Sequence, residues 1–490
     1  ILLEKPWVLR RSLKIVGRYW FRMIEPISLS QLAVATEGQV VGEDVYFSTI
    51  ATDTRTLKEG DLYVALKGER FDGHQFLEQA SQKGCSSFLI DAEFNLSEKE
   101  LQKVPHVIVN NTLRALGQCA HLNRQNFKGK IVGLTGSSGK TSTKNMLECI
   151  LSEKGATYAT QGNFNNEIGV PLTLLNINGT HEYAVIEMGA RRRGDIEYLV
   201  DFVQPDVAVL LNAGTSHIDV FGSQENIVIG KGEIFSSLKS DGLAVVNADD
   251  PAKQVWLDSL QGKNVLTFSL SDSEANVFAS DIKLGHLSSD FILNYQGESK
   301  EIVLPAPGLH NIANGLAASA AAIHLGISLS AIARGFSKLN ASQGRLMTVP
   351  CSENLVIIDD SYNANPSSMR AAIDVLSLKH GFKVAILGEM AELGDFSKKL
   401  HLELAIYLSQ SNVDKVYLIC PYATEMSEKI GKRATVCKTK KAIFDSLSEN
   451  ERIFENDRHE LVMTNVLSNA ATAVLFTPIA ANLALKLGVD

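Results

Sequence analysis

The segment 130–143, with the sequence KIVGLTGSSGKTST, contains residue types that could bind a nucleoside triphosphate. Glycines let a loop backbone approach a phosphate, Lys140 supplies a mobile positive charge, and Thr141 offers a hydroxyl to Mg²⁺. The segment departs from the strict pattern G-x-x-x-x-G-K-[ST], because Leu134 stands five positions before Gly139. We predict a phosphate-binding loop, and a chance turn rich in glycine and serine is the alternative.

The flanking residues predict the elements that would position this loop. A β-branched run, Ile131–Thr135, precedes it, and helix-forming sequence, Lys144–Glu153, follows it. From about Val107 to Leu329, apolar strands alternate with helical stretches, which predicts a parallel sheet covered on both faces. Residues 265–304 alternate like a β-rich excursion from this pattern.

Two polar residues follow strands of the predicted sheet. The strand Tyr183–Ile186 ends at Glu187, and the strand Val207–Leu211 leads to His217. Ligands of such sheets lie outside the carboxyl ends of the strands. We therefore expect Glu187 near Thr141, whereas the residues alone leave a structural and a functional role of His217 equally open. Lys231 lies in a predicted helix, where a lysine is normally solvated.

Two further regions flank this sheet. Between Ile27 and Pro105 short apolar runs alternate with turns, and 53–76 holds polar loops suited to a ligand, with solvated turns as the alternative. From about Ala333 the strand, polar loop and helix order returns, beginning with Gly344-Arg345 and the strand Leu355–Ile358. This region predicts a second doubly wound domain.

Composition limits the class of protein. The chain has 490 residues, enough for about three domains. A net charge of −8 argues against an electrostatic grip on nucleic acid. The six cysteines have no CxxC spacing, so we expect reduced thiols in a cytoplasmic protein.

Both ends of the chain differ from the middle. Residues 1–22 lack the apolar core and cleavage site of a signal peptide, so we interpret them as sequence outside the fold, with a basic membrane-surface helix as the alternative. Near the other end, 461–485 contains 25 residues without a charge, which is long enough to cross a bilayer.

Taken together, the motifs resemble the Mur ligase family of cell-wall amide ligases. They are TGSSGKT, FDGHQF, GNFNNEIGVPLTLL, EMGARRRGDI, TSHID, KGEIF, HNIANGLAA, DDSYNANP and LGEMAELG, in the family's order over about Met23 to Leu447. The resemblance is to the branch that adds D-alanyl-D-alanine to UDP-N-acetylmuramoyl-tripeptide, and the shortened phosphate loop is the family's own form.

The resemblance implies an α/β fold of three domains. These are a small N-terminal α/β domain for the UDP-linked substrate, a central phosphate-loop ATPase with a doubly wound, mostly parallel sheet, and a C-terminal Rossmann-like domain. We place them at 23–105, 106–332 and 333–448, after an extension at 1–22 and before an atypical apolar tail at 449–490.

The implied activity is ATP-dependent, ADP-forming amide ligation in peptidoglycan precursor synthesis. ATP would phosphorylate the terminal carboxylate of the tripeptide, and the amine of D-alanyl-D-alanine would attack the acyl phosphate. The implied cofactors are ATP and Mg²⁺. We expect a cytoplasmic monomer that binds no nucleic acid and meets a membrane only if its tail does.

The resemblance also implies roles for individual residues, some of which the phosphate-loop argument already suggests. The lysine matching Lys231 is often carbamylated in this family. The implied catalytic residues are Lys140, Glu187, His217 and Lys231, and the implied metal ligands are Thr141, Glu187 and His217. The implied ATP-binding residues are Thr135, Gly136, Ser137, Ser138, Gly139, Lys140, Thr141, Ser142, Asn311, Arg345 and Asp360. The implied substrate-binding residues are Asp53, Arg55, Asn163, Asn165 and Asn166 for the UDP-peptide, and Tyr362, Asn363 and Asn365 for D-alanyl-D-alanine.

The end of the chain departs from the family pattern. We expect no last strand after Glu449, and residues from about 455 to 485 resemble a membrane segment of the sodium-coupled anion symporter family. The alternatives for the whole chain are a sibling muramyl or folylpolyglutamate ligase and a phosphate-loop kinase or switch protein. The tail adds a third alternative, an inactive membrane-associated chimera.

Overall fold

The computed structural model describes residues 23–68, 71–340, 344–350, 355–449 and 459–464. They form two compact units. The first runs to Lys130 and includes Ala156–Ile186 and Asp201–Val203, and the second holds the remainder. The expected extension at 1–22 and most of the predicted tail lie outside the described residues.

The first unit is built on a five-stranded sheet, in the order β2-β9-β8-β5-β4. All neighbouring strands are parallel except β2 and β9. Its core contains Tyr63, Phe88 and Ile90, which are almost completely buried. The strands are β2 (Gln39–Val41), β4 (Ile50–Ala51), β5 (Leu62–Val64), β8 (Ser87–Asp91) and β9 (His106–Val109), beside the pairs β1 (Ile27–Ser28) with β3 (Tyr46–Phe47) and β6 (Lys67–Gly68) with β7 (Phe71–Asp72). Strand β9 lies past the boundary predicted at residue 105.

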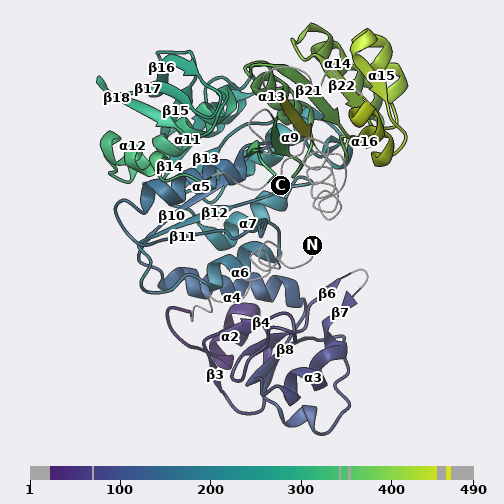
Figure 1. The fold of residues 1–490 in the computed structure, drawn as a ribbon. Helices are drawn as coiled ribbons and strands as arrows, with labels where there is room; N and C mark the ends of the chain where they lie inside the picture. Colours follow the sequence, from purple (N-terminus) through teal and green to yellow (C-terminus); the bar gives the residue numbers. More distant parts are fainter. Residues whose placement is uncertain (1–22, 69–70, 341–343, 351–354, 450–458, 465–490) are drawn as a thin grey trace, which may run out of the picture. The chain divides into compact units, whose positions relative to one another are not determined.

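Among the described residues, four α-helices lie wholly in the first unit (Figure 1). Two of them begin with side chains that accept backbone N–H groups, Ser28 before α2 and Asn111 before α4, which is why these helices start there. The helices are α2 (Leu29–Thr36), α3 (Leu77–Gln82), α4 (Thr112–Asn126) and α6 (Gly169–Leu175).

The largest sheet has nine strands, in the order β11-β12-β10-β13-β14-β15-β16-β17-β18. From β10 to β16 the strands of the second unit run parallel, and β16, β17 and β18 form antiparallel pairs, so the β-rich excursion predicted at 265–304 is confirmed. The strands are β10 (Lys130–Thr135), β11 (Thr157–Ala159), β12 (Tyr183–Glu187), β13 (Val207–Leu210), β14 (Leu243–Asn247), β15 (Asn264–Ser269), β16 (Val277–Leu284), β17 (Ser289–Tyr295) and β18 (Glu298–Leu304).

The helix after the phosphate loop begins earlier than predicted. It is α5 (Lys140–Leu151), so Lys140 and Thr141 lie in its first turn and not ahead of it. The early start is possible because the Thr143 N–H already donates to the Gly139 carbonyl at 2.9 Å. Helices α11 and α12 both pack on α5 (Figure 1). The remaining helices of this region are α7 (Asp195–Val203), α8 (Ile218–Phe221), α9 (Gln224–Gly232), α10 (Lys253–Ser259), α11 (Leu309–His324) and α12 (Leu329–Ser337).

A further sheet, of six strands, belongs to the second unit and has the order β19-β20-β24-β21-β22-β23. All of its strands run parallel except β19, which confirms the predicted doubly wound pattern. The strands are β19 (Met347–Pro350), β20 (Leu355–Asp360), β21 (Phe382–Leu387), β22 (Lys415–Leu418), β23 (Ala434–Val436) and β24 (His459–Thr464), and the helices are α13 (Pro366–Ser377), α14 (Ser397–Gln410), α15 (Ala423–Ile430) and α16 (Lys440–Glu449).

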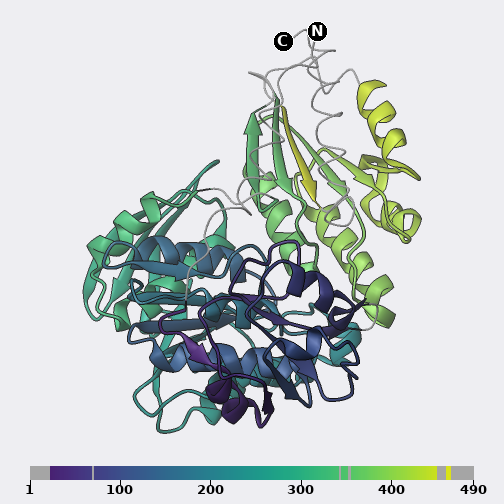
Figure 2. The same cartoon turned by 90° about the horizontal axis from the view of Figure 1, so that it is seen from below.

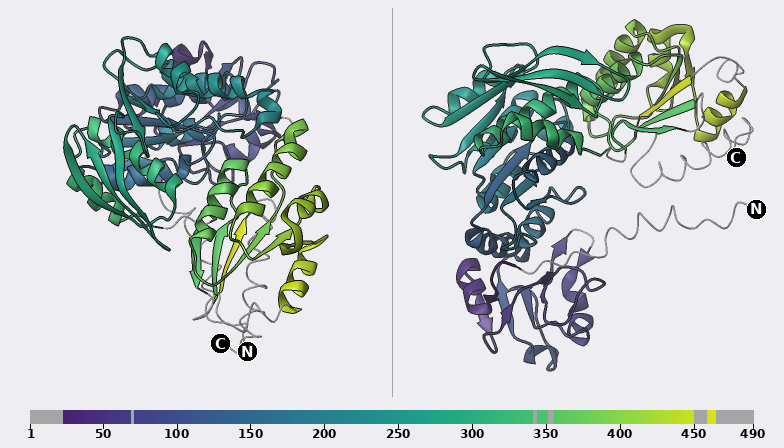
Figure 3. Two further views of the ribbon diagram at one scale, coloured as in Figure 1. Left: turned by 90° about the horizontal axis from the view of Figure 1, so that it is seen from above. Right: turned by 60° about the vertical axis from the view of Figure 1, so that its left-hand side comes forward.

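Strand β24 corrects the expectation that no strand follows Glu449. The yellow strand lies between green β20 and β21 in Figures 2 and 3, and its backbone pairs with both of them. The expectation is wrong because an uncharged apolar run such as the one from Leu461 suits a membrane segment, and strands inside a parallel sheet are apolar as well. Among the described residues, no helix is long and apolar enough to cross a membrane.

Candidate active site

The phosphate loop connects β10 to α5 and depends on its second glycine. Gly139 has φ +81°, a left-handed value that glycine adopts without strain. A Cβ atom there would overlap the side-chain oxygen of Asn314 on α11. Lys140 Nζ donates to the Gly136 carbonyl at 2.7 Å, so the lysine lies folded over its own loop.

Asn212 holds the serines of this loop. The Ser138 N–H donates to Asn212 Oδ1 at 3.0 Å, and the Ser137 N–H donates to the Asn212 carbonyl at 3.1 Å. Because Asn212 follows β13, the neighbour of β10, the adjacent strand fixes the loop conformation. This contact helps the loop keep its shape although Leu134 stands where the strict motif has its first glycine.

Thr141 lies where an acidic and a basic side chain meet. Its hydroxyl donates to Glu187 Oε2 at 2.9 Å and accepts from Arg345 Nη2 at 3.0 Å. Glu187 is only 2% exposed. The predicted proximity of Thr141 and Glu187 is therefore observed.

Two lysines lie beside this cluster, Lys140 partly exposed and Lys231 buried. Burial lowers the pKa of Lys140, and the nearby Glu187 carboxylate partly opposes that shift. Burial, reinforced by Lys140, lowers the pKa of Lys231 to about 7. Lys231 is 1% exposed, so the expectation of a solvated helical lysine is wrong. Its ammonium lies 5.7 Å from the centre of the Phe221 ring.

His217 starts α8 and contacts the loop after β21. Its Nδ1 lies 2.5 Å from Glu392 Oε2, within ion-pair distance but outside hydrogen-bond geometry. Burial lowers the pKa of the imidazole, and the Glu392 carboxylate acts in the opposite direction. Arg191 Nη2 donates to the same carboxylate at 2.7 Å. His217 therefore lies in a charged environment and not on an apolar face.

A cavity of about 190 Å³ opens beside the phosphate loop. Residues from the loop, from α11 and from the segment after α12 line it, and so do Asn212 and Asn314. Asn311 is held by a hydrogen bond from its Nδ2 to the Pro307 carbonyl at 2.8 Å. The predicted ATP-binding residues in the lining are Ser138, Gly139, Ser142, Asn311, Arg345 and Asp360, and two residues predicted to bind D-alanyl-D-alanine, Tyr362 and Asn363, line it too.

Arg345 is positioned by an unusual stretch of backbone. Gly344 and Leu346 both have positive φ, +70° and +51°. The Leu346 N–H donates to Asp360 Oδ1 at 3.2 Å, and the guanidinium of Arg345 lies 4.1 Å from the centre of the Tyr362 ring. Burial raises the pKa of Asp360 to about 7, against the effects of the Leu346 N–H and of Arg345.

Two predicted site residues use their side chains for the fold. The Thr135 hydroxyl is buried and donates to the Met188 carbonyl at 2.8 Å. Asn365 caps α13: its Oδ1 accepts the Ser368 N–H at 2.9 Å and the Ser367 hydroxyl at 2.7 Å. These contacts hold the start of α13, whose residues Ser367 and Ser368 line the cavity.

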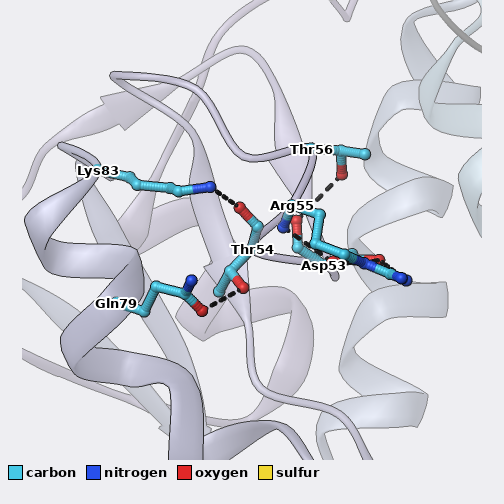
Figure 4. A network of polar contacts seen from close by, with 6 residues as sticks. All are labelled: Asp53, Thr54, Arg55, Thr56, Gln79 and Lys83. Atoms are coloured by element: carbon cyan, nitrogen blue, oxygen red, sulfur yellow. Dashed lines mark hydrogen bonds and ion pairs between the residues drawn. The ribbon is translucent and has the colours of Figure 1, made fainter.

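Asp53 and Arg55 lie in the first unit and form an ion pair (Figure 4). Arg55 lies against both carboxylate oxygens, and hydrogen bonding to Arg55 lowers the pKa of Asp53. The loop is anchored through Thr54, whose hydroxyl donates to Gln79 at 2.7 Å and whose carbonyl accepts from Lys83 at 2.6 Å. The Arg55 side chain is 86% exposed and is available to an anionic ligand.

The three predicted asparagines also lie in the first unit, in the loop before α6. Asn166 Oδ1 accepts the Gly169 N–H at 2.9 Å, so Asn166 shapes the start of that helix. Asn163 is exposed, and its carbonyl accepts the Asn165 N–H at 2.7 Å. A Cβ atom on Gly169 would overlap the backbone of Phe164, which fixes the tight turn of this loop.

Sequence reasoning missed three residues of the site in the second unit. Asn212 and Asn314 support the phosphate loop, and Glu392 contacts His217. All three lie inside or beside motifs that the sequence analysis quoted. The motif position of Asn314, three residues after Asn311 on the same helix, was a usable signal because such residues share a helix face.

Three family models match consecutive parts of the chain. The Mur ligase middle domain matches residues 134–322, the Mur ligase glutamate ligase domain matches 344–478, and the Mur ligase catalytic domain matches 46–124. The UDP-N-acetylmuramoyl-tripeptide--D-alanyl-D-alanine ligase of Escherichia coli (strain K12) is 40% identical over 390 residues, 80% of this chain and 85% of that protein. The chain belongs to the Mur ligase family.

Further relatives support the same family assignment for this Mur ligase. The ligase of the same name from Bacillus subtilis (strain 168) is 36% identical, over 80% of this chain and 84% of that protein. A crystal structure of MurF from Acinetobacter baumannii aligns with a TM-score of 0.87 and 33% identity, covering 94% of this chain and all of that one. MurF from Thermotoga maritima in complex with ADP aligns at 0.77 and 28%, covering 89% and 98%.

The comparisons do not support a symporter-like tail on this Mur ligase. The glutamate ligase domain matches as far as residue 478, across most of the stretch that suggested a membrane segment. The three-domain α/β architecture implied by the family resemblance is confirmed by the MurF structures.

Proposed function

We propose that this Mur ligase joins D-alanyl-D-alanine to UDP-N-acetylmuramoyl-tripeptide in an ATP-dependent, ADP-forming reaction of peptidoglycan precursor synthesis. The observation that carries the proposal is the cluster of Thr141, Glu187 and Arg345 beside a phosphate loop. It occurs in a chain 40% identical to a ligase named for this reaction.

ATP would occupy the cavity beside the phosphate loop. The first N–H groups of α5 and the Lys140 ammonium would meet its phosphates, because a helix start and a cation both favour an anion. Arg345, held by the Tyr362 ring, would add a second cation at the γ-phosphate. Asn311 and Asp360 line the same cavity and would lie near the nucleoside.

The donor set around Thr141 fits Mg²⁺. A hydroxyl and a buried carboxylate 2.9 Å apart are hard oxygen donors. Among the described residues, no three His, Cys, Asp or Glu side chains cluster as metal ligands, so phosphate oxygens would complete the shell, as is usual for Mg²⁺. We propose Thr141 and Glu187 for one ion and His217 for a second. Bound Mg²⁺ neutralises charge on the phosphate oxygens.

The reaction would proceed in two steps. An oxygen of the tripeptide's terminal carboxylate attacks the γ-phosphorus, and ADP leaves. The amine of D-alanyl-D-alanine then attacks the acyl carbon, loses a proton, and expels phosphate to form the amide. The cations around the loop serve the first step, in which two anions must approach each other.

The other proposed residues serve substrate binding. We propose that the exposed guanidinium of Arg55, with Asp53 and the loop of Asn163, Asn165 and Asn166, binds the UDP-peptide. Tyr362, Asn363 and Asn365 are proposed near D-alanyl-D-alanine, although Tyr362 and Asn363 also line the nucleotide cavity.

We further propose a cytoplasmic monomer. The five described cysteines are free thiols, which fits a reducing compartment: Cys85, Cys119, Cys149, Cys420 and Cys437.

Donor and acceptor profiling tests the function. The enzyme would be incubated with ATP, each UDP-muramyl-peptide, and either D-alanyl-D-alanine or a single amino acid. We expect amide product only with the tripeptide and the dipeptide. Phosphate release with a single amino acid but not with D-alanyl-D-alanine would identify a sibling ligase, and ADP without any peptide product would indicate a kinase.

A further inference from the structure

Glu392 connects two side chains that stand far from it in sequence. Its carboxylate lies 2.7 Å from Arg191 Nη2 and 2.5 Å from His217 Nδ1, one oxygen to each. No motif assigned Glu392 a role, and its loop follows β21 in the six-stranded sheet, whereas Arg191 and His217 follow β12 and β13. One carboxylate therefore connects two loops at the edge of the nine-stranded sheet to a loop of the six-stranded sheet.

The backbone at this contact is held in an uncommon conformation. His217 and Glu392 both have φ +60°, a left-handed value that is rare for residues other than glycine. Such residues persist where their surroundings determine the conformation, and they concentrate at functional sites.

The two loops also approach each other closely. A Cβ atom on Gly394 would lie 2.9 Å from Asp219 Cβ, so only glycine fits at that position. Gly394 also has a positive φ, +49°. Close packing two residues from each partner of the ion pair fixes where the carboxylate meets the imidazole.

A stability role does not explain this arrangement. Arg191 is 70% exposed and Glu392 38%, and exposed ion pairs contribute little to folding. His217 is less exposed, at 23%, and the other charged groups that affect it, Lys140, Lys231 and Arg191, are all cations. Glu392 is the carboxylate that offsets them.

We propose that Glu392 is a positioning residue for the ligase reaction: it orients His217 and Arg191. The site that these two residues form at the edge of the nine-stranded sheet is then complete only when the 389–396 loop is docked on it. The proposal rests on the proposed function, in which His217 is a candidate ligand for a second Mg²⁺. Carboxylates that orient a ligating histidine affect metal affinity or activity by about 10–100-fold.

The test compares Glu392→Gln, which keeps the size and removes the charge, with Asp395→Asn. Asp395 is an exposed carboxylate of the same loop, so its variant makes the same chemical change nearby. Two quantities are measured. One is kcat and KM for ATP, and the other is the Kd of Mn²⁺ for enzyme bound to a non-hydrolysable ATP analogue, read by electron paramagnetic resonance without turnover.

Glu392→Gln is expected to lower kcat and to weaken Mn²⁺ binding, each by about tenfold or more, while KM for ATP stays within about twofold. Asp395→Asn is expected to match the wild type. The melting temperature should hardly change, because exposed ion pairs add little stability.

The proposal is overturned if Glu392→Gln leaves kcat and the Mn²⁺ affinity at wild-type values. It is equally overturned if lost activity only follows lost folded protein, with Mn²⁺ affinity per folded molecule unchanged. Mn²⁺ binding can be measured without any amide product. A wild-type enzyme that made no amide would therefore contradict the proposed function, and the Mn²⁺ affinity of Glu392→Gln would still decide whether Glu392 positions His217.

Discussion

The Thr141 hydroxyl donates a hydrogen bond to the buried carboxylate of Glu187 at 2.9 Å, which joins the first turn of α5 to the end of β12. The same oxygen accepts a hydrogen bond from Arg345. One hydroxyl therefore links an acidic and a basic side chain beside the phosphate loop, where an anionic substrate and its counter-ions would meet.

The first prediction concerns this hydroxyl. Thr141→Val keeps the shape of the side chain and removes the oxygen, and we expect kcat to fall by about 10²–10³-fold. Thr141→Ser keeps the oxygen and should stay within about fivefold of the wild type. Steady-state kinetics at saturating ATP measures both, and equal activity of the two variants would contradict the assigned role.

The second prediction concerns Gly139. Gly139→Ala is expected to weaken ATP binding by at least about tenfold, because the new methyl group overlaps Asn314 and distorts the loop. The control is Gly297→Ala in the turn between β17 and β18, which has nearly the same φ, +82°, but no atom within 4 Å. It carries the same backbone strain, about 1–2 kcal/mol, without the overlap.

Calorimetric titration with ATP separates the two variants. Gly297→Ala should lose stability and keep wild-type affinity, whereas Gly139→Ala should lose both. If both variants bound ATP as tightly as the wild type, close packing against Asn314 would not be what shapes the loop.

The third prediction concerns the cap of α13. Asn365→Ala removes the acceptor of the Ser368 N–H and should cost about 1 kcal/mol of stability. Asn365→Ser keeps a capping oxygen and should recover most of that loss. Thermal unfolding of the wild type and both variants measures these differences in stability. A raised KM for D-alanyl-D-alanine in both variants, beyond the change in stability, would indicate substrate contact as well, and equal stability of all three proteins would contradict the capping role.

Much of the site follows from sequence because parallel strands place their carboxyl ends along one edge. That rule brings Glu187 to Thr141 without knowledge of the packing. The contact of His217 with Glu392 could not be derived in this way, since it depends on how a loop 175 residues later in the chain packs. The burial of Lys231 was missed for a related reason: the nine residues of α9 carry too few polar and apolar alternations to show which face is covered.

The strands likewise divide into those that the sequence predicts and those that it does not. Strands β10, β12 and β13 of the large sheet were predicted within one or two residues because their apolar runs are bounded by turn or polar residues, whereas β11 was not predicted and β16 to β18 were predicted only as a β-rich stretch. Strand β24 was missed because its last four residues, from Leu461 to Thr464, begin an uncharged stretch whose length favours a membrane helix. Composition alone does not separate those two structures.

The fourth prediction concerns the pH dependence of stability. Burial raises the pKa of Asp360 from 3.8 to about 7, so between these values the folded protein holds a proton that the unfolded chain releases. The stability that this proton provides is complete below about pH 4 and is lost as the pH rises through 7. Asp360→Asn should therefore gain stability relative to the wild type from pH 4 to 7, by at most about 1.4 kcal/mol per pH unit.

Thermal unfolding of both proteins at pH 5 and pH 7.5 measures this difference. The variant should be favoured more at pH 7.5. An equal difference at both values, or a larger one at pH 5, would contradict the raised pKa of Asp360.

The most direct test of the central claim, amide formation through an acyl phosphate, follows the oxygen atoms. UDP-N-acetylmuramoyl-tripeptide labelled with ¹⁸O in its terminal carboxylate would be incubated with ATP, Mg²⁺ and D-alanyl-D-alanine, and the inorganic phosphate analysed by mass spectrometry. We predict one labelled oxygen in each phosphate and one retained in each new amide. Phosphate that carries no label, with its new oxygen taken from water, would show ATP hydrolysis separate from ligation and would contradict this account.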